Sequence, residues 1–199
     1  MKSWEEYRVE VPEGQAGDWS IARFTVPDAP TIQNLRYAMH GMMTVPPGVY
    51  TRLMRKGDWE PMMSDTPAEI ASHLGAIYKA KGRVLLNGLG LGMVLKAILA
   101  KPDVLSVDVV EIDPDVASLV WPTYAADPRA HLHIADALSI TWPREQRWDV
   151  AWHDIWPNIC SDNWPTMKQL QRRYASKTDW QDSWQRPWVR RLIRQGVGR

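Results

Sequence analysis

Cysteine is nearly absent from this sequence of 199 residues, which contains only Cys160. One cysteine excludes an internal disulfide and a zinc site made of cysteines alone. The sequence also lacks an apolar run of the roughly 20 residues that a membrane-spanning helix needs. Its start, MKSWEEYRVE, lacks the apolar segment of a signal peptide. These absences predict a cytoplasmic globular protein with no membrane partner.

Net charge is nearly absent as well, because 24 Lys and Arg face 23 Asp and Glu, which leaves +1. The charge is unevenly distributed, however, since residues 163–199 contain nine basic and two acidic residues. The same end is rich in tryptophan: eight of the twelve lie at or after Trp142, whereas the whole chain has one Phe. A basic, Trp-rich end therefore follows a mildly acidic body.

Three of these tryptophans, Trp180, Trp184 and Trp188, recur at the four-residue spacing of a helix face. Six arginines accompany them: Arg172, Arg173, Arg186, Arg190, Arg191 and Arg194. Aromatic and basic side chains together indicate a nucleic-acid partner. The alternative is a helix that buries its tryptophans against the domain and exposes its arginines. We expect the alternative, because charged helix faces are usually only solvated.

The chain divides into three parts by composition. Residues 1–63 are rich in Pro, Gly and β-forming residues and predict a small β appendage, residues 64–160 predict an α/β core, and residues 161–199 predict a helical extension. Within the appendage, short strands are expected at residues 7–11, 20–26 and 50–55, and the last of these opens a hairpin through a turn at Lys56-Gly57-Asp58.

The core opens with a helix that the sequence marks clearly, from Thr66 to about Ala80. Thr66-Pro67-Ala68-Glu69 places Thr at the N-cap, Pro at the first helical position and Glu three residues after the cap, which is the pattern of a capping box. Strands then alternate with helices: strands are expected at residues 83–87, 105–111, 131–134 and 148–153, and helices at residues 93–100 and 113–121. This alternation predicts a Rossmann-like, doubly wound and mostly parallel sheet.

No strand is expected after Asp154, because residues 163–176 and 179–195 have helical patterns. The sheet is therefore expected to be truncated at its C-terminal strands, or to be completed by the N-terminal strands or by a partner subunit in a homodimer.

A glycine-rich turn follows the first strand of the core. Gly88, Gly90 and Gly92 end that strand and open the next helix, where glycine either lets the backbone approach a ligand or serves tight packing. Glu111 ends the next strand, where a carboxylate can accept hydrogen bonds from both ribose hydroxyls. Met93 stands where a dinucleotide-binding loop has its third glycine, so a nucleoside ligand without a pyrophosphate is favoured.

Four motifs of the core resemble, in order and spacing, those of class I S-adenosylmethionine-dependent methyltransferases. They are Val84-Leu85-Leu86-Asn87-Gly88-Leu89-Gly90-Leu91-Gly92, Val109-Val110-Glu111-Ile112-Asp113-Pro114, Ile134-Ala135-Asp136-Ala137 and Trp148-Asp149-Val150-Ala151-Trp152-His153-Asp154. The spermidine synthase branch is the most similar, since its members also have a D-P-R, here Asp127-Pro128-Arg129, before the third strand. The resemblance covers about residues 62–157 and implies S-adenosylmethionine as the cofactor.

The resemblance also implies roles for nine residues. Asn87, Gly88, Gly90 and Gly92 line the methionine and ribose part of the cofactor, Glu111 binds the ribose hydroxyls, Ile112 packs on the adenine, Asp136 and the Ala137 backbone lie at the adenine amino group, and Asp154 is the catalytic residue facing the reacting centre. Asp154 is preferred to His153 because neighbours in a strand point to opposite faces. Asp65 either faces the amino group of the cofactor or, as we expect, is a second cap for the helix that follows it.

Two departures from the spermidine synthase pattern bear on the reaction. Leu91 and Pro157 stand where aminopropyl-transferring members have acidic residues that hold a polyamine cation, and a buried ammonium group without a partner is costly. The sequence therefore favours a methyltransferase acting on a small-molecule acceptor over an aminopropyltransferase that uses decarboxylated S-adenosylmethionine. A non-catalytic nucleoside- or nucleic-acid-binding module is the third alternative. No metal is expected, since His131 and His133 share a strand face but lack further ligands.

Overall fold

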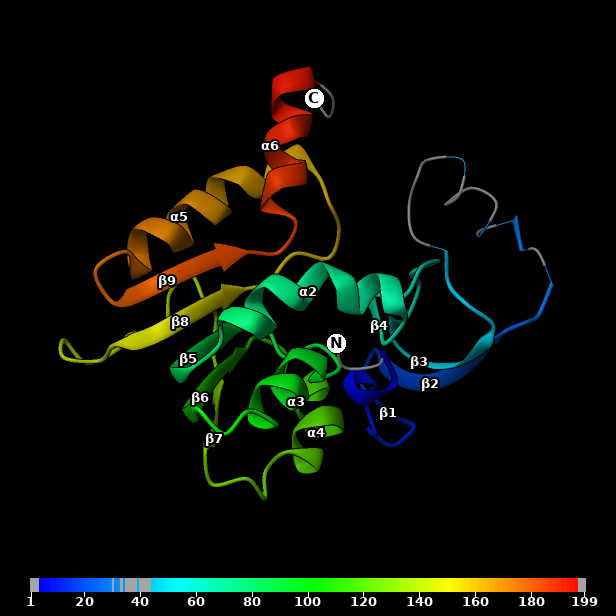
Figure 1. Ribbon diagram of the computed structural model, residues 1–199, viewed down its shortest axis with the longest axis horizontal. Coiled ribbons are helices and arrows are strands. Elements are labelled where there is room, and N and C mark those ends of the chain that lie inside the picture. Colours follow the sequence, from blue (N-terminus) through cyan, green and yellow to red (C-terminus); the bar gives the residue numbers. More distant parts are fainter. Residues whose placement is uncertain (1–3, 30, 33, 35–38, 40–43, 197–199) are drawn as a thin grey trace.

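The computed structural model describes residues 4–29, 31–32, 34, 39 and 44–196 (Figure 1). Parts of the predicted appendage and extension, including residues 1–3, 40–43 and 197–199, lie outside the described residues. Within the described part of the chain, every helix is too short or too polar to span a bilayer.

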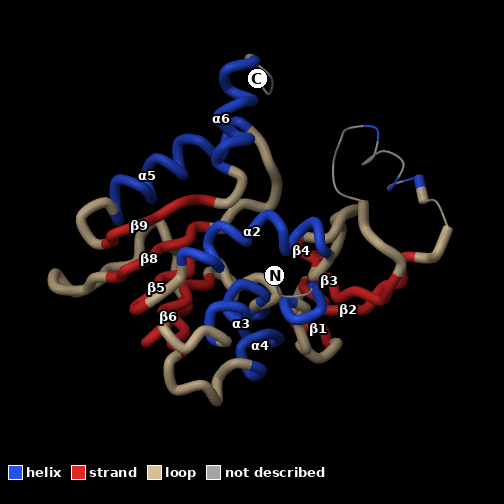
Figure 2. Tube along the Cα trace, viewed as in Figure 1, coloured by secondary structure: helices blue, strands red, loops and turns tan. Residues whose placement is uncertain are grey.

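A five-stranded parallel sheet forms the centre of the molecule (Figure 2). In sheet order its strands are β7 (Ala130–Ile134), β6 (Val104–Glu111), β5 (Gly82–Asn87), β8 (Trp148–His153) and β9 (Thr178–Ser183). The order runs outward from β5 in both directions, since β6 and β7 follow on one side and β8 and β9 on the other. The predicted α/β, doubly wound fold is confirmed, and the strand order reverses between β5 and β8.

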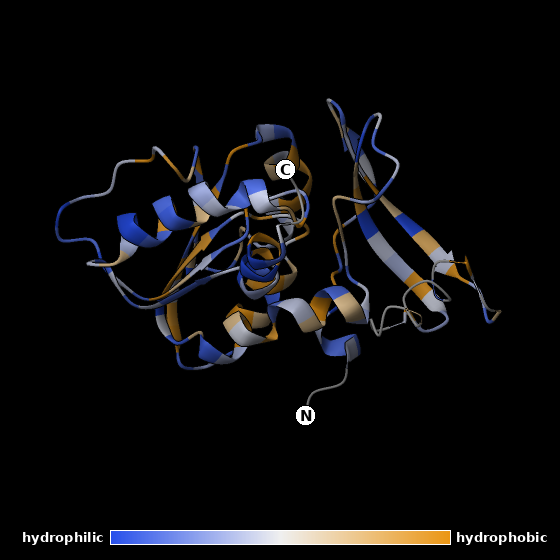
Figure 3. Ribbon diagram, turned by 90° about the horizontal axis from the view of Figure 1, so that it is seen from above, coloured by the Kyte–Doolittle hydropathy of each residue, from blue (hydrophilic) through white to orange (hydrophobic). Residues whose placement is uncertain are grey.

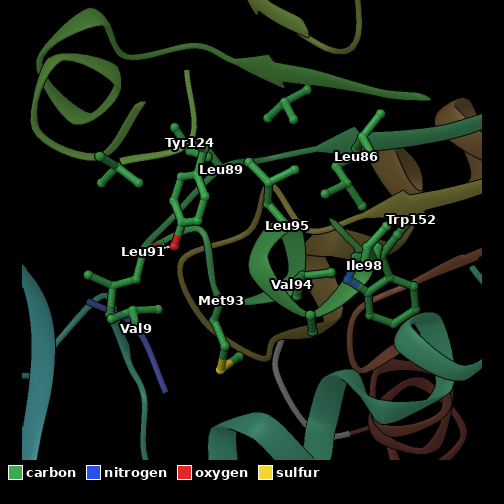
Figure 4. Close-up of a cluster of buried hydrophobic side chains, with 14 of the residues drawn as sticks. Val9, Leu86, Leu89, Leu91, Met93, Val94, Leu95, Ile98, Tyr124 and Trp152 are labelled. Carbon is green, nitrogen blue, oxygen red and sulfur yellow. Dashed lines mark hydrogen bonds between the residues drawn. The ribbon is translucent and has the colours of Figure 1, made fainter. Parts of the chain in front are cut away.

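Helices cover both faces of this sheet. α2 (Pro67–Lys79), α3 (Met93–Leu99) and α4 (Pro114–Val120) lie on one face, and α5 (Trp164–Tyr174) lies on the other (Figure 1). Consecutive residues of a strand point to opposite faces. Leu86 therefore packs in the same core as Ile98 of α3 (Figure 4), whereas Leu85 packs in the core of Leu170 from α5. Both faces are buried, which explains the continuous apolar runs of the central strands.

β9 corrects the prediction that no strand follows Asp154. Residues 178–183 pair in parallel with β8, with Trp180 opposite Val150 and Ser183 opposite His153. The sequence of β9, Thr-Asp-Trp-Gln-Asp-Ser, has no apolar run, and most of its side chains are only partly buried, as is usual at the edge of a sheet. Such a polar segment carries no pattern that separates a strand from a solvated helix.

The predicted helix face of three tryptophans is also wrong. Trp180 lies in β9, Trp184 lies in the turn after it, and Trp188 lies in α6 (Arg186–Gln195). α6 begins at Arg186, so Pro187 lies in its first turn and not in the middle of a longer helix. In the first turn, proline does not interrupt the hydrogen bonds of a helix. Trp188 is 48% exposed, so the three side chains do not form one buried stripe.

The N-terminal part forms a separate antiparallel sheet. Its strands, in order, are β1 (Gly14–Ala16), β2 (Trp19–Val26), β3 (Gly48–Arg55) and β4 (Met63–Ser64), so the second arm of the predicted hairpin is only two residues long. Residues 7–11 do not form the expected strand, although Val9 and Val11 are buried. Seen from above, the sheet stands beside the core (Figure 3). Trp19 Nε1 donates a hydrogen bond to Asp113 Oδ2 at 2.6 Å, which ties this sheet to the start of α4.

α2 begins as predicted, with Thr66 at the N-cap and Pro67 in the first turn. The capping box is wrong, however, because the Thr66 side chain makes no capping hydrogen bond. Glu69 turns toward His73 instead, and 3.3 Å separates Glu69 Oε1 from His73 Nε2. The carboxylate of Glu69 is therefore available for interactions away from the end of its own helix.

Candidate active site

A cleft of about 510 Å³ opens at the carboxyl ends of β5, β6 and β8, at the point where the strand order reverses. Ligands of open parallel sheets bind at such a point. The N-terminal sheet closes one side of the cleft with Trp19, Leu53 and Met63, and the loop after β8 closes another with Trp156 and Pro157. The volume is within the range of small-molecule sites, about 300–1,000 Å³.

Seven of the nine predicted site residues line this cleft: Gly88, Gly90, Glu111, Ile112, Asp136, Ala137 and Asp154. They lie at the ends of different strands or directly after them, and the parallel topology brings these strand ends to one edge of the sheet. Asn87 and Gly92 do not line the cleft. Asn87 is fully buried with its Nδ2 directed at His153, and Gly92 faces the ring of Tyr124. The assignment of the residues to cofactor binding stays a prediction.

The glycine turn packs closely at two points. A Cβ atom added at Gly88 would overlap the carbonyl oxygen of Asp154, just after β8. A Cβ atom added at Gly90 would overlap Met63 Sδ of β4, and this sulfur accepts the N–H of Leu91 at 3.3 Å. Gly88 is therefore needed where two neighbouring strands end, and Gly90 is needed for contact with the N-terminal sheet, while both also line the cleft.

Glu111 places a largely buried carboxylate beside the glycine turn. Its Oε2 accepts the N–H of Leu89 at 2.9 Å, and its Oε1 accepts the N–H of Asp113 at 2.9 Å. Burial raises the pKa of Glu111, and these backbone hydrogen bonds oppose that effect. A carboxylate has about four sites that accept hydrogen bonds, so Glu111 can hold the turn and still accept hydroxyl groups of a ligand.

Asp154 follows β8 and is fixed by its own backbone, because its N–H donates to the Asn87 carbonyl oxygen at 2.7 Å. Its side chain is 21% exposed and lines the cleft. Burial raises the pKa of Asp154 to about 6, the charge of His73 lowers it, and the charges of Glu69 and Glu111 raise it. Asp154 is therefore mostly ionised at pH 7 and can take up a proton at slightly lower pH.

His153 points away from the cleft, as the alternation of side chains in a strand predicts. It is fully buried and its ring stacks on Tyr174 of α5, with 5.3 Å between the ring centroids. Asn87 Nδ2 donates to His153 Nδ1 at 2.7 Å, and His153 Nε2 donates to Gln181 Oε1 at 3.1 Å. Burial lowers the pKa of His153 to about 4, although the hydrogen bond with Gln181 acts to raise it. His153 is therefore a neutral structural residue that links β5, β8 and β9.

Replacing His153 by Gln is expected to weaken the pH dependence of stability. Because the pKa of His153 is about 4 in the folded protein and ordinarily 6.5, the unfolded chain binds this proton more readily. The wild-type protein should lose about 3 kcal/mol of unfolding free energy from this group between pH 7 and pH 4. His153→Gln should not lose it, while other groups titrate alike in both proteins. Urea unfolding across this range tests the difference, and equal pH slopes would contradict it.

His73 and Trp184 are residues of this region that sequence reasoning missed. Trp184 lines the cleft. His73 lies fully buried beside Trp184, with 6.4 Å between the centroids of the two rings. His73 Nε2 lies 3.3 Å from Glu69 Oε1 and 3.8 Å from Asp154 Oδ2. One signal was present in the sequence, because Glu69 and His73 are four residues apart on a predicted helix and so share a face.

Asp65 neither caps α2 nor lines the cleft. Its fully buried carboxylate accepts the N–H of Thr51 at 2.6 Å through Oδ1 and the N–H of Val9 at 3.3 Å through Oδ2. Arg8 Nε lies 3.6 Å from the same Oδ2. Asp65 therefore joins the N-terminal segment to β3 and has a structural role.

No protein-family model and no curated protein matches the sequence. Among solved structures, the chain is similar to spermidine synthase from Thermotoga maritima, with a TM-score of 0.44 and 20% identity over 70% of this chain and 44% of the other. It is similar to a dimethyladenosine transferase from Plasmodium falciparum, with a TM-score of 0.40 and 20% identity over 55% of this chain and 37% of the other. It is also similar to an N-methyltransferase from Bradyrhizobium japonicum, with a TM-score of 0.41 and 11% identity over 55% of this chain and 57% of the other. The chain spans less than two thirds of each of these proteins.

Proposed function

We propose that the chain is an S-adenosylmethionine-dependent methyltransferase that acts on a small-molecule acceptor. The observation that carries this proposal is the position of Glu111, whose carboxylate bonds to the backbone of the glycine turn at the point where the strand order reverses. A carboxylate in this place is suited to accept ribose hydroxyls.

The other lining residues fit a nucleoside ligand. Gly88 and Gly90 present no side chain to the cleft, and Ile112, which is 67% exposed, offers an apolar surface to a purine. Asp136 adds a second carboxylate, and its Oδ1 accepts the N–H of Leu138 at 2.8 Å, which fixes its orientation. These residues would hold the adenosine part of S-adenosylmethionine.

Asp154 supplies the acid–base group of the proposed reaction. When bound, S-adenosylmethionine supplies an electrophilic methyl group. Asp154 is anionic at neutral pH and stands at the mouth of β8, where it can orient an acceptor and take its proton. Trp156 and Trp184 give this end of the cleft aromatic walls that can exclude water from the acceptor.

Aminopropyl transfer from decarboxylated S-adenosylmethionine is the second candidate. Leu91 is buried and Pro157 lines the cleft, so neither supplies the acidic group expected for a polyamine. Glu69, however, adds a carboxylate that sequence reasoning did not assign to the cleft. Calorimetry with S-adenosylmethionine and with its decarboxylated form separates the two functions, since a methyltransferase should bind the first more tightly.

Replacing Glu111 by Ala is expected to weaken the binding of S-adenosylhomocysteine by about 1.5–3 kcal/mol, the value of hydrogen bonds to a charged group. This loss corresponds to an increase in Kd of roughly 10–150-fold. The exposed Glu145→Ala is the matched control and should bind normally. Isothermal titration calorimetry measures both. Unchanged affinity in a folded Glu111→Ala protein would remove Glu111 from the site and, with it, the main support for the proposed function.

A further inference from the structure

Beneath the cleft, α2 brings an imidazole between two carboxylates. His73 Nε2 lies 3.3 Å from Oε1 of Glu69, one turn earlier on α2, and 3.8 Å from Oδ2 of Asp154 after β8. The side chains of Glu69 and Asp154 are 26% and 21% exposed and line the cleft, whereas His73 has no exposed surface. The imidazole is therefore placed to act on the two carboxylates and not on a ligand directly.

The ring of His73 is held in this orientation by two tryptophans. Trp152 meets it edge to face with 6.0 Å between centroids, and Trp184 stacks on it at 6.4 Å. Trp184 is itself anchored, because its Nε1 donates to Ser72 Oγ at 2.9 Å. The tryptophans therefore fix the ring, and the two carboxylates favour its protonated form. His73 Nδ1 is buried without a partner among the described residues, which leaves Nε2 as the nitrogen that interacts.

The charges around Asp154 show what His73 contributes. Burial and the neighbouring charges of Glu69 and Glu111 all favour the neutral form of Asp154, and the charge of His73 opposes them. For His73 itself, burial lowers the pKa, but the hydrogen bond with Glu69 and the charge of Asp154 outweigh burial and raise it. Imidazole and carboxylate therefore stabilise each other's ionised form.

We propose that His73 is a positioning residue that keeps Asp154 anionic, so that Asp154 can accept the proton of an N–H or O–H acceptor during transfer. The inference rests on the proposed function. The lone pair of the acceptor bonds to the methyl carbon, the electron pair of the broken carbon–sulfur bond stays on sulfur, and the acceptor proton moves to Asp154. Glu69 holds the imidazolium from the other side, and His73 keeps its own proton throughout.

The test is the titration of Asp154 in wild type and in His73→Gln, followed by ¹³C NMR of the labelled carboxyl group and assigned with Asp154→Asn. Gln keeps an N–H donor but removes the charge, so the midpoint of Asp154 should rise by about 1–3 pH units, and the acid limb of turnover should move with it. His133→Gln is the matched control. It breaks a His–Asp pair of 2.8 Å with Asp108 outside the cleft and should leave the Asp154 midpoint unchanged.

A second measurement covers the case in which His73→Gln does not fold. In wild type, NMR of the His73 imidazole should show the protonated ring persisting above pH 6.5, the ordinary midpoint of histidine. A ring that is neutral at pH 6, or a folded His73→Gln protein with an unchanged Asp154 midpoint, would overturn the proposal. S-adenosylhomocysteine is titrated into the same samples: failure of wild type to bind it counts against the proposed function, while the two titrations report on His73 independently.

Discussion

Deletion of residues 178–199 is expected to leave a protein that does not fold to a soluble state. The deletion removes β9, exposes the edge of β8 and takes away Gln181, which bonds to the buried His153. It also removes Trp180 and Trp184, which pack against the main core. A mostly apolar strand with an unpaired edge is prone to aggregate. The net stability of a domain is only about 5–15 kcal/mol, so loss of a whole strand and of two packed tryptophans is expected to unfold it.

Deletion of residues 186–199 alone is the matched control, because it removes α6 and keeps β9. α6 has one fully buried side chain, Val189, whose burial contributes about 2 kcal/mol. The shorter deletion should therefore stay folded, with a Tm about 4–8 °C lower. Circular dichroism and size-exclusion chromatography of both proteins measure the result. A soluble, cooperatively folded protein that ends at residue 177 would contradict the role given to β9.

The shorter deletion also tests the nucleic-acid alternative. Arg190, Arg191 and Arg194 are exposed and make no ion pair within the described residues, which fits a solvated helix face and a nucleic-acid arm alike. Because charged helix faces are usually only solvated, binding to single-stranded RNA or DNA, measured at several salt concentrations, is expected to be unaffected by loss of α6. If a folded deletion lost a strongly salt-dependent affinity that the full chain has, the tail would be a nucleic-acid arm.

Replacing Gly88 by Ala is expected to destabilise the fold by about 2–6 kcal/mol. Gly88 has a φ of +104°, which costs about 1–3 kcal/mol for a residue with a Cβ atom. The new methyl group would also overlap the Asp154 carbonyl oxygen, and overpacking adds about 1–3 kcal/mol. Because the obstacle is backbone and not a flexible side chain, neighbouring strands would have to move apart.

Gly57→Ala separates strain from overlap. Gly57 has a similar φ of +92°, but apart from Gly57 and its two chain neighbours none of the described residues has an atom within 4 Å of the Cβ position. It should show the cost of backbone strain alone, so the difference between the two variants gives the cost of the overlap. Urea unfolding measures both, and equal losses would mean that the end of β5 can move away from Asp154 without cost.

The core could be predicted from the sequence because its signals are local. The apolar runs of β5, β6 and β8 mark strands buried on both faces, and Asp113 marks the start of α4, where its side chain accepts the N–H of Asp115. β9 was missed because its stability comes from pairing with β8 and not from its own composition. In the same way, Trp180, Trp184 and Trp188 have helical spacing but lie in three different elements.

The candidate site divides along the same line. Gly88, Glu111 and Asp154 were found because each lies at the end of a strand or directly after it, and the ends of parallel strands meet. His73 was missed because its partner Asp154 is far away in the sequence, and only the packing of α2 over the sheet brings the two side chains within 3.8 Å. The sequence pattern of a helix start accounted for Glu69 as part of a capping box, so its contact with His73 was not predicted.

The central pairing of β5 with β8 has a consequence for the order of folding. Asn87 and His153, opposite each other in this pair, are 66 residues apart, so closing the loop between them costs roughly 4 kcal/mol of chain entropy before any contact compensates. β5, β6 and β7 pair with their neighbours in chain order, so we expect them to assemble first and β8, which must pair back with β5, to join late. The cleft opens at the carboxyl ends of β5 and β8, where these two strands pair. Ligand binding should therefore act mainly on the unfolding rate, since it holds together the part of the sheet that closes last.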